Sequence, residues 1–357
     1  MRYISISEHD ILTKIKNNII FEKEYLNSDI QMSNNKLDYI KFAKEEPIPL
    51  YLQPWWLDSV CSSDGLSWDV LLYKKGGHIW GSFVYISKYK MGYKILTIPK
   101  LTQITGLYIK YPKNQKYSKK IAWEKEIMQY FINKLPHFDF LNITLHHSIT
   151  NWLPFKWAGF KQSTIYTYVI EDLQDLDKVY NNFDHHARNN IKKALKHGVE
   201  VIDSNDINTF YEINKITFEN QDLPMPYSFS FIKNLYNSGK RNNSVKMKFA
   251  IKDKKIYSVM LSFYDKKTLY TIAGSSDRNI NTYGAEYLLY WEMMKFASQK
   301  GLSFDFEGSI IERIEKRNRY FGAIQKRYFD ISKSNSFLLS LRGFLSDVKR
   351  NRIKHIN

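Results

Sequence analysis

The sequence predicts an α/β protein of two lobes that share one arrangement of strands and helices. The chain has 357 residues, too many for one ordinary core and suitable for two domains of roughly 150 residues each. With 43% hydrophobic and 25% charged residues, its composition is that of a globular protein. The same order of apolar segments occurs twice, with a shift of 163 residues between Gly159-Phe-Lys-Gln162 and Gly322-Ala-Ile-Gln325. These observations predict mixed sheets in two tandem domains that arose by duplication.

Each half starts with a predicted β-hairpin. Residues 68–86 and residues 248–263 each contain two apolar runs separated by a turn of charged or glycine residues. A further apolar strand follows each hairpin, at residues 93–98 and 268–273. Both halves are therefore expected to begin as antiparallel sheets.

Each half continues with a helix and two more strands. Residues 122–135 and 285–299 have apolar residues at the three- and four-residue spacing that buries one helix face. Strands are expected next at residues 138–144 and 302–307, and an aromatic strand closes each half. We therefore expect an N-terminal domain at residues 1–165, a C-terminal domain at 166–335 and a basic tail at 336–357.

A single helix is expected between the halves, over residues 173–197. Apolar residues recur there at every fourth position, and Gly198 follows as a stop signal. Beside them, Arg188 and Lys192 begin a series of basic residues at i, i+4 spacing. This helix should present cations to solvent or to a ligand, so Arg188 and Lys192 are candidate substrate-binding residues.

The charge and cysteine content limit the partners and cofactors. Lysine and arginine number 53 against 36 acidic residues, and the net charge of +17 favours nucleic acid, CoA, nucleotide-sugars or acidic lipids. Because the charge is spread along the chain, a general bias towards lysine explains it equally well. Cys61 is the only cysteine, so an intrachain disulfide is excluded and no metal is expected. No apolar run of about 18 residues occurs, and charges interrupt the first residues, so a cytoplasmic protein is expected.

The loop at residues 274–285 is the first candidate ligand site. It joins a predicted strand to a predicted helix, which is where open α/β sheets bind ligands. Backbone amides and the positive end of the helix dipole would face a phosphate there. The alternative is a solvent loop, since the glycines are too few for a P-loop. The candidate cofactor-binding residues are Gly274, Ser275, Arg278, Gly284 and Ala285.

Two carboxylates at the end of a predicted strand are the second candidate. Strand alternation puts Asp305 and Glu307 on one face, and neighbouring carboxylates raise each other's pKa, which can produce a general base. Gly308 would let a substrate approach the backbone. The alternative is that the two carboxylates are structural and form ion pairs with nearby arginines, namely Arg313, Arg317 or Arg319.

Polar and aromatic residues follow the equivalent strand of the first half. His146, beside His147, is a candidate base or hydrogen-bond donor, and Asn151 and Trp152 follow it as candidate substrate-binding residues. Adjacent histidines are also common as structural or surface residues. The tryptophans could form core or stack on a sugar or base: Trp55, Trp56, Trp152 and Trp157. No G-x-S-x-G motif or kinase signature set appears, which disfavours covalent hydrolase chemistry.

As a set, three segments resemble the double-domain GNAT acyltransferases, which are similar to the Fem peptidyltransferases. The segments are the helix at residues 188–199, the helix at 284–292 and the strand end at 304–309. The resemblance covers residues 45–335 and implies a GNAT-like fold in each lobe. It implies an acyl donor in the second lobe and an acceptor amine in the cleft between the lobes.

The resemblance leaves two donors open. The family's phosphate-binding pattern, Gln or Arg followed by x-x-Gly-x-Gly/Ala, is only partly met by residues 278–285. Fem enzymes take aminoacyl-tRNA instead of acyl-CoA, and many carry a two-helix arm. The expected helix at residues 173–197 is too short for that arm, which favours acyl-CoA.

The chemistry of acyl transfer then suggests roles for the candidate residues. Glu307, next to Asp305, would take the proton of the amine, directly or through water, and the Ala273–Gly274 strand end would stabilise the oxyanion. Tyr320 would protonate the leaving group, although an aromatic residue before Phe321 also suits a core.

We therefore expect a metal-independent N-acyltransferase that acts on an amine of a cell-envelope or polysaccharide precursor, carried on a sugar or a lipid. The first lobe would be degenerate and would bind the acceptor. One alternative is an aminoacyl-tRNA-dependent peptidyltransferase. The other is a non-catalytic protein that binds nucleic acid or a membrane surface through the basic helix and the tail residues Arg342, Lys349, Arg350, Arg352 and Lys354.

Overall fold

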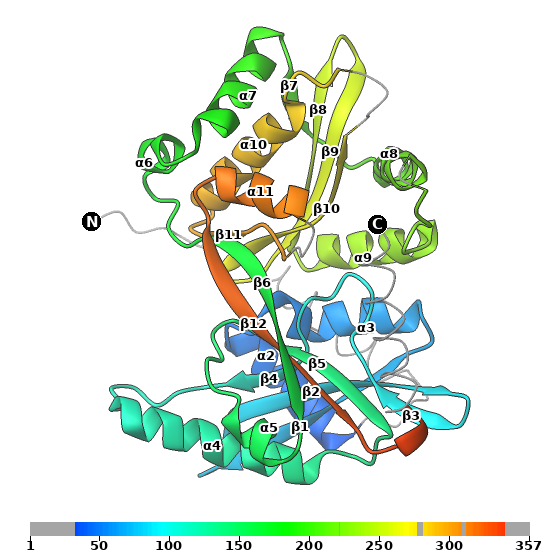
Figure 1. Cartoon of the computed structure of the whole chain (residues 1–357), viewed down its shortest axis with the longest axis vertical. Coiled ribbons are helices and arrows are strands. Elements are labelled where there is room, and N and C mark those ends of the chain that lie inside the picture. Colours follow the sequence, from blue (N-terminus) through cyan, green and yellow to red (C-terminus); the bar gives the residue numbers. More distant parts are fainter. Residues whose placement is uncertain (1–32, 221, 277–280, 309–311, 340–357) are drawn as a thin grey trace, which may run out of the picture.

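The computed structural model describes residues 33–220, 222–276, 281–308 and 312–339 (Figure 1). The basic tail residues from Arg342 onwards lie outside the described residues. The first half contains α2 (Asn34–Glu45), η1 (Leu50–Leu52), α3 (Pro54–Ser62), β1 (Ser67–Lys75), β2 (His78–Lys90), β3 (Tyr93–Leu96), β4 (Gly106–Ile109), α4 (Tyr117–Lys134), β5 (Phe140–Leu145), α5 (Leu153–Trp157) and β6 (Lys161–Ile170). The second contains α6 (Leu176–Asn181), α7 (His185–Lys196), β7 (Glu200–Asp203), α8 (Ile207–Glu219), α9 (Phe229–Arg241), β8 (Val245–Lys252), β9 (Lys255–Tyr264), β10 (Thr268–Ser276), α10 (Ala285–Gln299), β11 (Ser303–Asp305), α11 (Glu312–Tyr320) and β12 (Ile324–Ser334).

The predicted duplication is present in the structure. Both hairpins form, β1 with β2 and β8 with β9, and helix α10 has the predicted bounds. A shift of 163 residues carries the first residue of β5, Phe140, onto the first residue of β11, Ser303. The same shift carries Lys161 of β6 onto Ile324 of β12. The chain is therefore a mixed α/β protein in which each half repeats one set of elements.

The two halves exchange their last strands. Among the described residues the strands form one sheet in the order β1-β2-β3-β5-β12-β6-β11-β10-β9-β8-β7, with β4 beside β2. Strand β12, from the end of the second half, pairs with β5 of the first, and β6 of the first half pairs with β11 of the second. Figure 1 shows β6 and β12 crossing between the halves.

We call the first lobe the elements from α2 to α5 together with β12, and the second lobe the elements from α6 to α11 together with β6. The domain boundary expected after residue 165 stays a prediction, and it falls inside strand β6.

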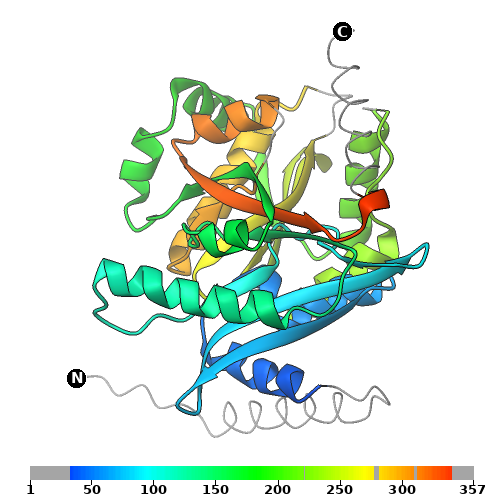
Figure 2. The ribbon, with the colours of Figure 1, turned by 60° about the horizontal axis from the view of Figure 1, so that its bottom comes forward.

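Helices cover both faces of the second-lobe sheet. Alternation along β9 directs Val259, Leu261 and Phe263 to one face and Met260 to the other. The first face packs against α8 and α9, and the second packs against α7 and α10. Figure 2 shows that the first lobe lies against the α9 side, where the two lobes share one apolar core.

The helix expected over residues 173–197 is interrupted, which corrects that prediction. Helix α6 ends at Asn181, and α7 begins after Asp184, whose side chain accepts a hydrogen bond from the backbone N–H of His186. Asp184 is thus an N-cap in the middle of the apolar stripe. Helices α8 and α9, which precede the second hairpin, were not predicted from the sequence.

The strand expected over residues 302–307 is shorter than predicted. It ends at Asp305, and Glu307 has a positive φ of 63°. The backbone therefore turns sharply at the second of the two candidate carboxylates. Among the described residues, no helix has both the length and the apolarity needed to cross a bilayer.

Candidate functional site

Asp305 and Glu307, the carboxylate pair, lie buried where the two lobes meet. Glu307 accepts hydrogen bonds from the side chains of Tyr51, in the first lobe, and Gln103. Asp305 accepts from the Thr167 hydroxyl and, at 2.8 Å, from the backbone N–H of Glu307. The carboxylate pair thus connects η1, β6 and the end of β11.

Hydroxyl groups surround the carboxylate pair in place of cations. Tyr328 of β12 donates to Asp305 at 3.3 Å. Within the described part of the chain, neither carboxylate takes part in an ion pair, because Arg317 pairs with Glu286 and Arg319 with Glu315. The alternative that the carboxylate pair forms ion pairs with these arginines is therefore wrong.

Burial without a cation makes ionisation of both groups unfavourable. Burial raises the pKa of Asp305 to about 6, although hydrogen bonds from Thr167, from the Glu307 N–H and from Tyr328 lower it. Burial and the charge of Asp305 raise the pKa of Glu307 well above its usual value, against the hydrogen bonds from Tyr51 and Gln103. The same burial raises the pKa of Tyr51 and of Tyr328. Both groups therefore keep their protons to a higher pH than exposed carboxyl groups do.

The backbone around the carboxylate pair is tightly packed. A Cβ atom on Gly308 would lie 2.3 Å from the Tyr166 carbonyl oxygen of β6. The glycine is required for close strand contact, so its predicted role of admitting a substrate is not supported. The catalytic roles of Asp305 and Glu307 stay predictions, and neither residue lines the two large pockets described next.

A pocket of about 770 Å³, the second-lobe pocket, lies at the end of β10. Gly274 and Ser275 form one wall, and Tyr320 of α11 lies opposite with the His186 ring 4.6 Å from its own. The lining comprises His186, Thr217, Phe218, Leu223, Gly274, Ser275, Ser276, Glu286, Tyr287, Arg313, Ile314, Lys316, Arg317 and Tyr320. Three of the expected site residues thus meet in one hollow.

Helix α11 makes the second-lobe pocket basic. Arg313, Lys316 and Arg317 all line it, and only Arg317 has an ion-pair partner among the described residues. Arg313 and Lys316 are exposed and can meet an anionic ligand. Arg317 is half-buried, lies 4.7 Å from the Tyr290 ring and pairs with Glu286, so it has a structural role.

The amino end of α10, the other half of the predicted phosphate site, is covered by α7. A Cβ atom on Gly284 would lie 2.4 Å from the Asn190 carbonyl oxygen, and the Tyr283 ring stacks on His197 at 4.2 Å. Ala285 is fully buried, and its N–H donates to the Thr282 carbonyl oxygen. The structure therefore argues against phosphate binding at Gly284 and Ala285. Arg278 lies outside the described residues.

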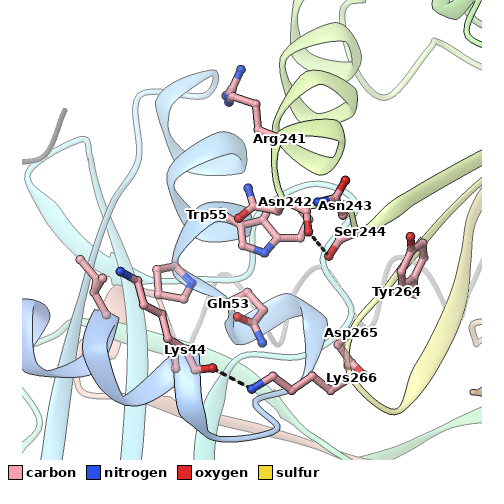
Figure 3. Close-up of a pocket in the computed structure, with 13 residues that line it drawn as sticks. Lys44, Gln53, Trp55, Arg241, Asn242, Asn243, Ser244, Tyr264, Asp265 and Lys266 are labelled. Atoms are coloured by element: carbon pink, nitrogen blue, oxygen red, sulfur yellow. Dashed lines mark hydrogen bonds between the residues drawn. The ribbon is translucent and has the colours of Figure 1, made fainter. Parts of the chain in front are cut away.

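A second pocket of about 520 Å³, the interlobe pocket, lies between α2 and α3 of the first lobe and α9 and the β9–β10 turn of the second (Figure 3). Its wall includes Trp55, beside the Asn242–Ser244 turn, and Arg241 at the end of α9. Lys266 donates to the carbonyl oxygens of Lys44 at 2.7 Å and Glu45 at 3.0 Å, which fixes the end of α2. The pocket thus combines an aromatic surface with an arginine.

The remaining predicted substrate residues lie outside both pockets. Arg188 donates to the carbonyl oxygens of Asn181 and Phe183 at the end of α6. Asn151 accepts from the Leu153 N–H at the start of α5, and Trp152 packs against Phe329. These three side chains therefore have contacts within the protein, and their substrate-binding roles stay predictions. Lys192 is exposed on α7.

His146 lies in a separate small cavity of about 130 Å³ with Tyr270 and Asp265. Burial and the neighbouring His147 lower the pKa of His146 well below its usual value. It is therefore neutral at pH 7, and its substrate-binding role stays a prediction. Of the tryptophans, Trp56 is core, Trp157 is exposed and Trp55 lines the interlobe pocket.

Most of the interlobe pocket could not be predicted from the sequence. Its residues come from positions more than 180 apart along the chain, and Arg241 and Lys44 follow no recognisable motif. Of the α11 cations that line the second-lobe pocket, Arg313 and Arg317 were expected only as partners of the carboxylate pair. Among the described residues, no group of three or more His, Cys, Asp or Glu is placed to hold a metal ion.

Comparisons with known proteins agree with this architecture. Residues 181–313 match the model of the acetyltransferase (GNAT) domain. No curated protein sequence gives a significant match. The structure is similar to that of FemX, with a TM-score of 0.65 and 16% identity over 84% of this chain and 96% of FemX.

Two further solved structures share the fold. A protein of unknown function from Bacteroides thetaiotaomicron has a TM-score of 0.53 and 13% identity, covering 84% of this chain and 97% of its own. L-PGS from Bacillus licheniformis has a TM-score of 0.50 and 7% identity, covering 88% and 96%. Residues 181–313 therefore form a GNAT domain, and the chain as a whole has the fold of FemX.

Proposed function

We propose that the enzyme transfers an aminoacyl group from aminoacyl-tRNA to an amine of a cell-envelope precursor. The observation that carries this proposal is the second-lobe pocket, where Arg313 and Lys316 face an opening at the end of β10. Two cations beside Tyr320 that form no ion pair with a described residue suit a polyanionic donor whose acyl end enters the pocket.

The covered end of α10 favours tRNA over acyl-CoA. A CoA diphosphate bound in the manner of the family's phosphate pattern needs free amides at Gly284 and Ala285, and α7 covers these residues. The resemblance to the Fem enzymes is compatible with aminoacyl-tRNA, although the missing two-helix arm taken alone favours acyl-CoA. Acyl-CoA is the second candidate, because the matched domain model is that of acetyltransferases.

Within this proposal the reaction is aminolysis of an ester. The amine nitrogen attacks the aminoacyl carbonyl carbon, a tetrahedral oxyanion forms, and the ribose hydroxyl leaves with a proton. In this proposal the Tyr320 hydroxyl gives its proton to the leaving ribose oxygen and recovers one from the attacking amine, and the Ala273–Gly274 strand end is our candidate oxyanion site. Because Asp305 and Glu307 are buried away from both pockets, we assign them a positioning role between the lobes.

The interlobe pocket is our candidate acceptor site. Arg241 suits a phosphate group, and Trp55 suits a sugar or base. The two pockets lie near opposite ends of β10, and the extended strand from Thr268 to Gly274 measures about 20 Å. An elongated precursor, linked to a nucleotide or lipid phosphate, would span that length. A cytoplasmic location fits such substrates and stays a prediction.

The first test compares donors. Labelled aminoacyl-tRNA and acetyl-CoA are each incubated with the protein and a panel of amine-bearing precursors. Transfer from tRNA that ribonuclease abolishes supports the proposal, whereas transfer from acetyl-CoA alone overturns it in favour of the second candidate.

The second test uses the α11 cations. The double variant Arg313→Ala/Lys316→Ala should weaken donor binding about tenfold or more, because each cation contributes charge-assisted hydrogen bonds. The control Lys119→Ala/Lys134→Ala removes two exposed charges from α4, far along the chain, and should bind like the parent. Equal losses in both variants would show that only net charge matters.

A further inference from the structure

The hairpin formed by β2 and β3 projects beyond the rest of the sheet. Ser87 is the last residue of β2 that pairs with β1, opposite Ser67, yet β2 continues to Lys90 with β3 alone beside it. Figure 2 shows this tip extending past the neighbouring elements. It therefore offers a convex surface and not a groove.

The turn at this tip exposes a methionine in a strained conformation. Met91 and Gly92 have φ angles of 53° and 81°, the left-handed pair that two-residue hairpins require. The hairpin of β1 and β2 meets this requirement with Gly76 and Gly77, at 58° and 76°. Met91 is 80% exposed and Tyr89 is 74% exposed, so the strain places apolar groups in solvent.

A second segment adds apolar side chains beside the hairpin. Phe140 of β5 pairs with Ile95 of β3 on one side and with Ser334 of β12 on the other. Ile95 of β3 and Ser334 at the end of β12 are therefore about 10 Å apart. Phe337 and Leu338 follow β12 and are 79% and 63% exposed.

Three lysines accompany these apolar groups. Lys88 and Lys90 alternate with Tyr89 along β2, and Lys94 follows the turn on β3. None of the three forms an ion pair with a described carboxylate. We call these seven residues the hairpin-tip patch: Lys88, Tyr89, Lys90, Met91, Lys94, Phe337 and Leu338.

We infer that the hairpin-tip patch docks the enzyme on an anionic lipid bilayer. Apolar and aromatic side chains ringed by unpaired lysines match the boundary between acyl chains and acidic headgroups. Tyr89 and Phe337 could each stack on a base, but a nucleic acid also needs a groove that follows its backbone, and Met91 and Leu338 offer neither stacking nor hydrogen bonds. The inference does not depend on which donor the enzyme uses.

Vesicle co-sedimentation tests this inference. The full chain should bind vesicles of mixed phosphatidylglycerol and phosphatidylcholine, lose that binding as salt is raised, and bind phosphatidylcholine alone at least tenfold more weakly. The variant Met91→Asn places a residue that tolerates positive φ at the turn, so the fold should be no less stable. Together with Phe337→Ser, it should reduce the partition coefficient at least tenfold.

Charge variants and controls sharpen the result. Each of Lys88→Gln and Lys90→Gln should cost about fivefold in partitioning. Tyr117→Ser is the matched control, because Tyr117 lies on α4 and is also 74% exposed. A Trp at position 89 (Tyr89→Trp) should be quenched by brominated lipid.

Three outcomes would overturn the inference. One is unchanged vesicle binding in Met91→Asn/Phe337→Ser, and another is an equal loss in Tyr117→Ser. The third is that the hairpin-tip variants lose tRNA binding or self-association instead, which would assign the surface to RNA or to a second copy of the chain.

Discussion

Strands β5 and β11 occupy equivalent places in the two lobes, but the acidic residue of the polar contact lies on β11 in the second lobe and on the exchanged strand β12 in the first. At the shift of 163 residues, Asp305 of β11 corresponds to Asn142 of β5, and Thr167 of β6 corresponds to Asp330 of β12. In the second lobe the carboxylate of β11 accepts from the exchanged strand. In the first lobe the carboxylate lies on the exchanged strand and accepts from Asn142 at 2.9 Å.

Burial makes the two arrangements unequal. Asp305 is fully buried, with Glu307 beside it, whereas Asp330 is half-buried and also accepts from the exposed Ser163 at 3.2 Å. The first lobe has Thr144 at the position that corresponds to Glu307. Thr144 itself donates to Asp330 at 3.2 Å, whereas Glu307 is a second buried acid at the junction with η1.

The largest expected effect comes from Gly308, whose counterpart in the first lobe is Leu145. Gly308→Ala would push a Cβ against the Tyr166 carbonyl oxygen, with 2.3 Å between them, so we expect a loss of about 3 kcal/mol or more in the free energy of unfolding. Urea denaturation measures it. Gly159→Ala is the control, because its Cβ meets nothing within 4 Å and only its φ of 79° is unfavourable. Similar losses in both variants would mean that the close contact between β6 and the end of β11 is not tight.

The elements of both lobes that depend on neighbouring residues could be predicted from local patterns in the sequence. The hairpins and helix α10 follow from apolar periodicity, and α10 has the predicted bounds because Gly284 and Gly301 enclose one continuous buried face. Asp305 and Glu307 were found because two acids end a strand, although their burial was not expected.

Features that depend on distant contacts were not predictable. The exchange of β6 and β12 leaves no local mark, since each strand has the pattern of a closing strand in either sheet. The break at Asp184 was not predicted because the apolar stripe continues through it. The N-cap is a single hydrogen bond between Asp184 and His186, two residues apart. The covering of Gly284 by α7 and the interlobe pocket arise from residues far apart in sequence.

The next effect concerns pH. Burial raises the pKa of Asp305 to about 6 in the folded chain, above its usual value near 4, so the folded state binds more protons than the unfolded state between these values. Stability contributed by the protonated form is thus present below about pH 4 and is lost as pH rises through about 6. Asp305→Asn, which copies Asn142, should remove on the order of 3 kcal/mol of this dependence, measured as unfolding free energy from pH 4 to 8. Asp330→Asn is the matched control and should keep the parent's slope, and an unchanged slope in Asp305→Asn would contradict the assignment.

The smallest effect compares the hydroxyl donors across the exchanged strands. Thr167→Val removes the buried hydroxyl that donates to Asp305 and leaves that carboxylate one donor short, which should cost about 1–3 kcal/mol in unfolding free energy at pH 7. Ser163→Ala removes the hydroxyl that donates to Asp330, but water can replace it at an exposed position, so the cost should be below about 0.5 kcal/mol. Because protonated Asp305 needs fewer donors, the Thr167→Val loss should shrink at pH 4. If the loss of unfolding free energy in Thr167→Val does not depend on pH, it arises from the packing of β6. The two lobes would then not differ in the electrostatics of these contacts.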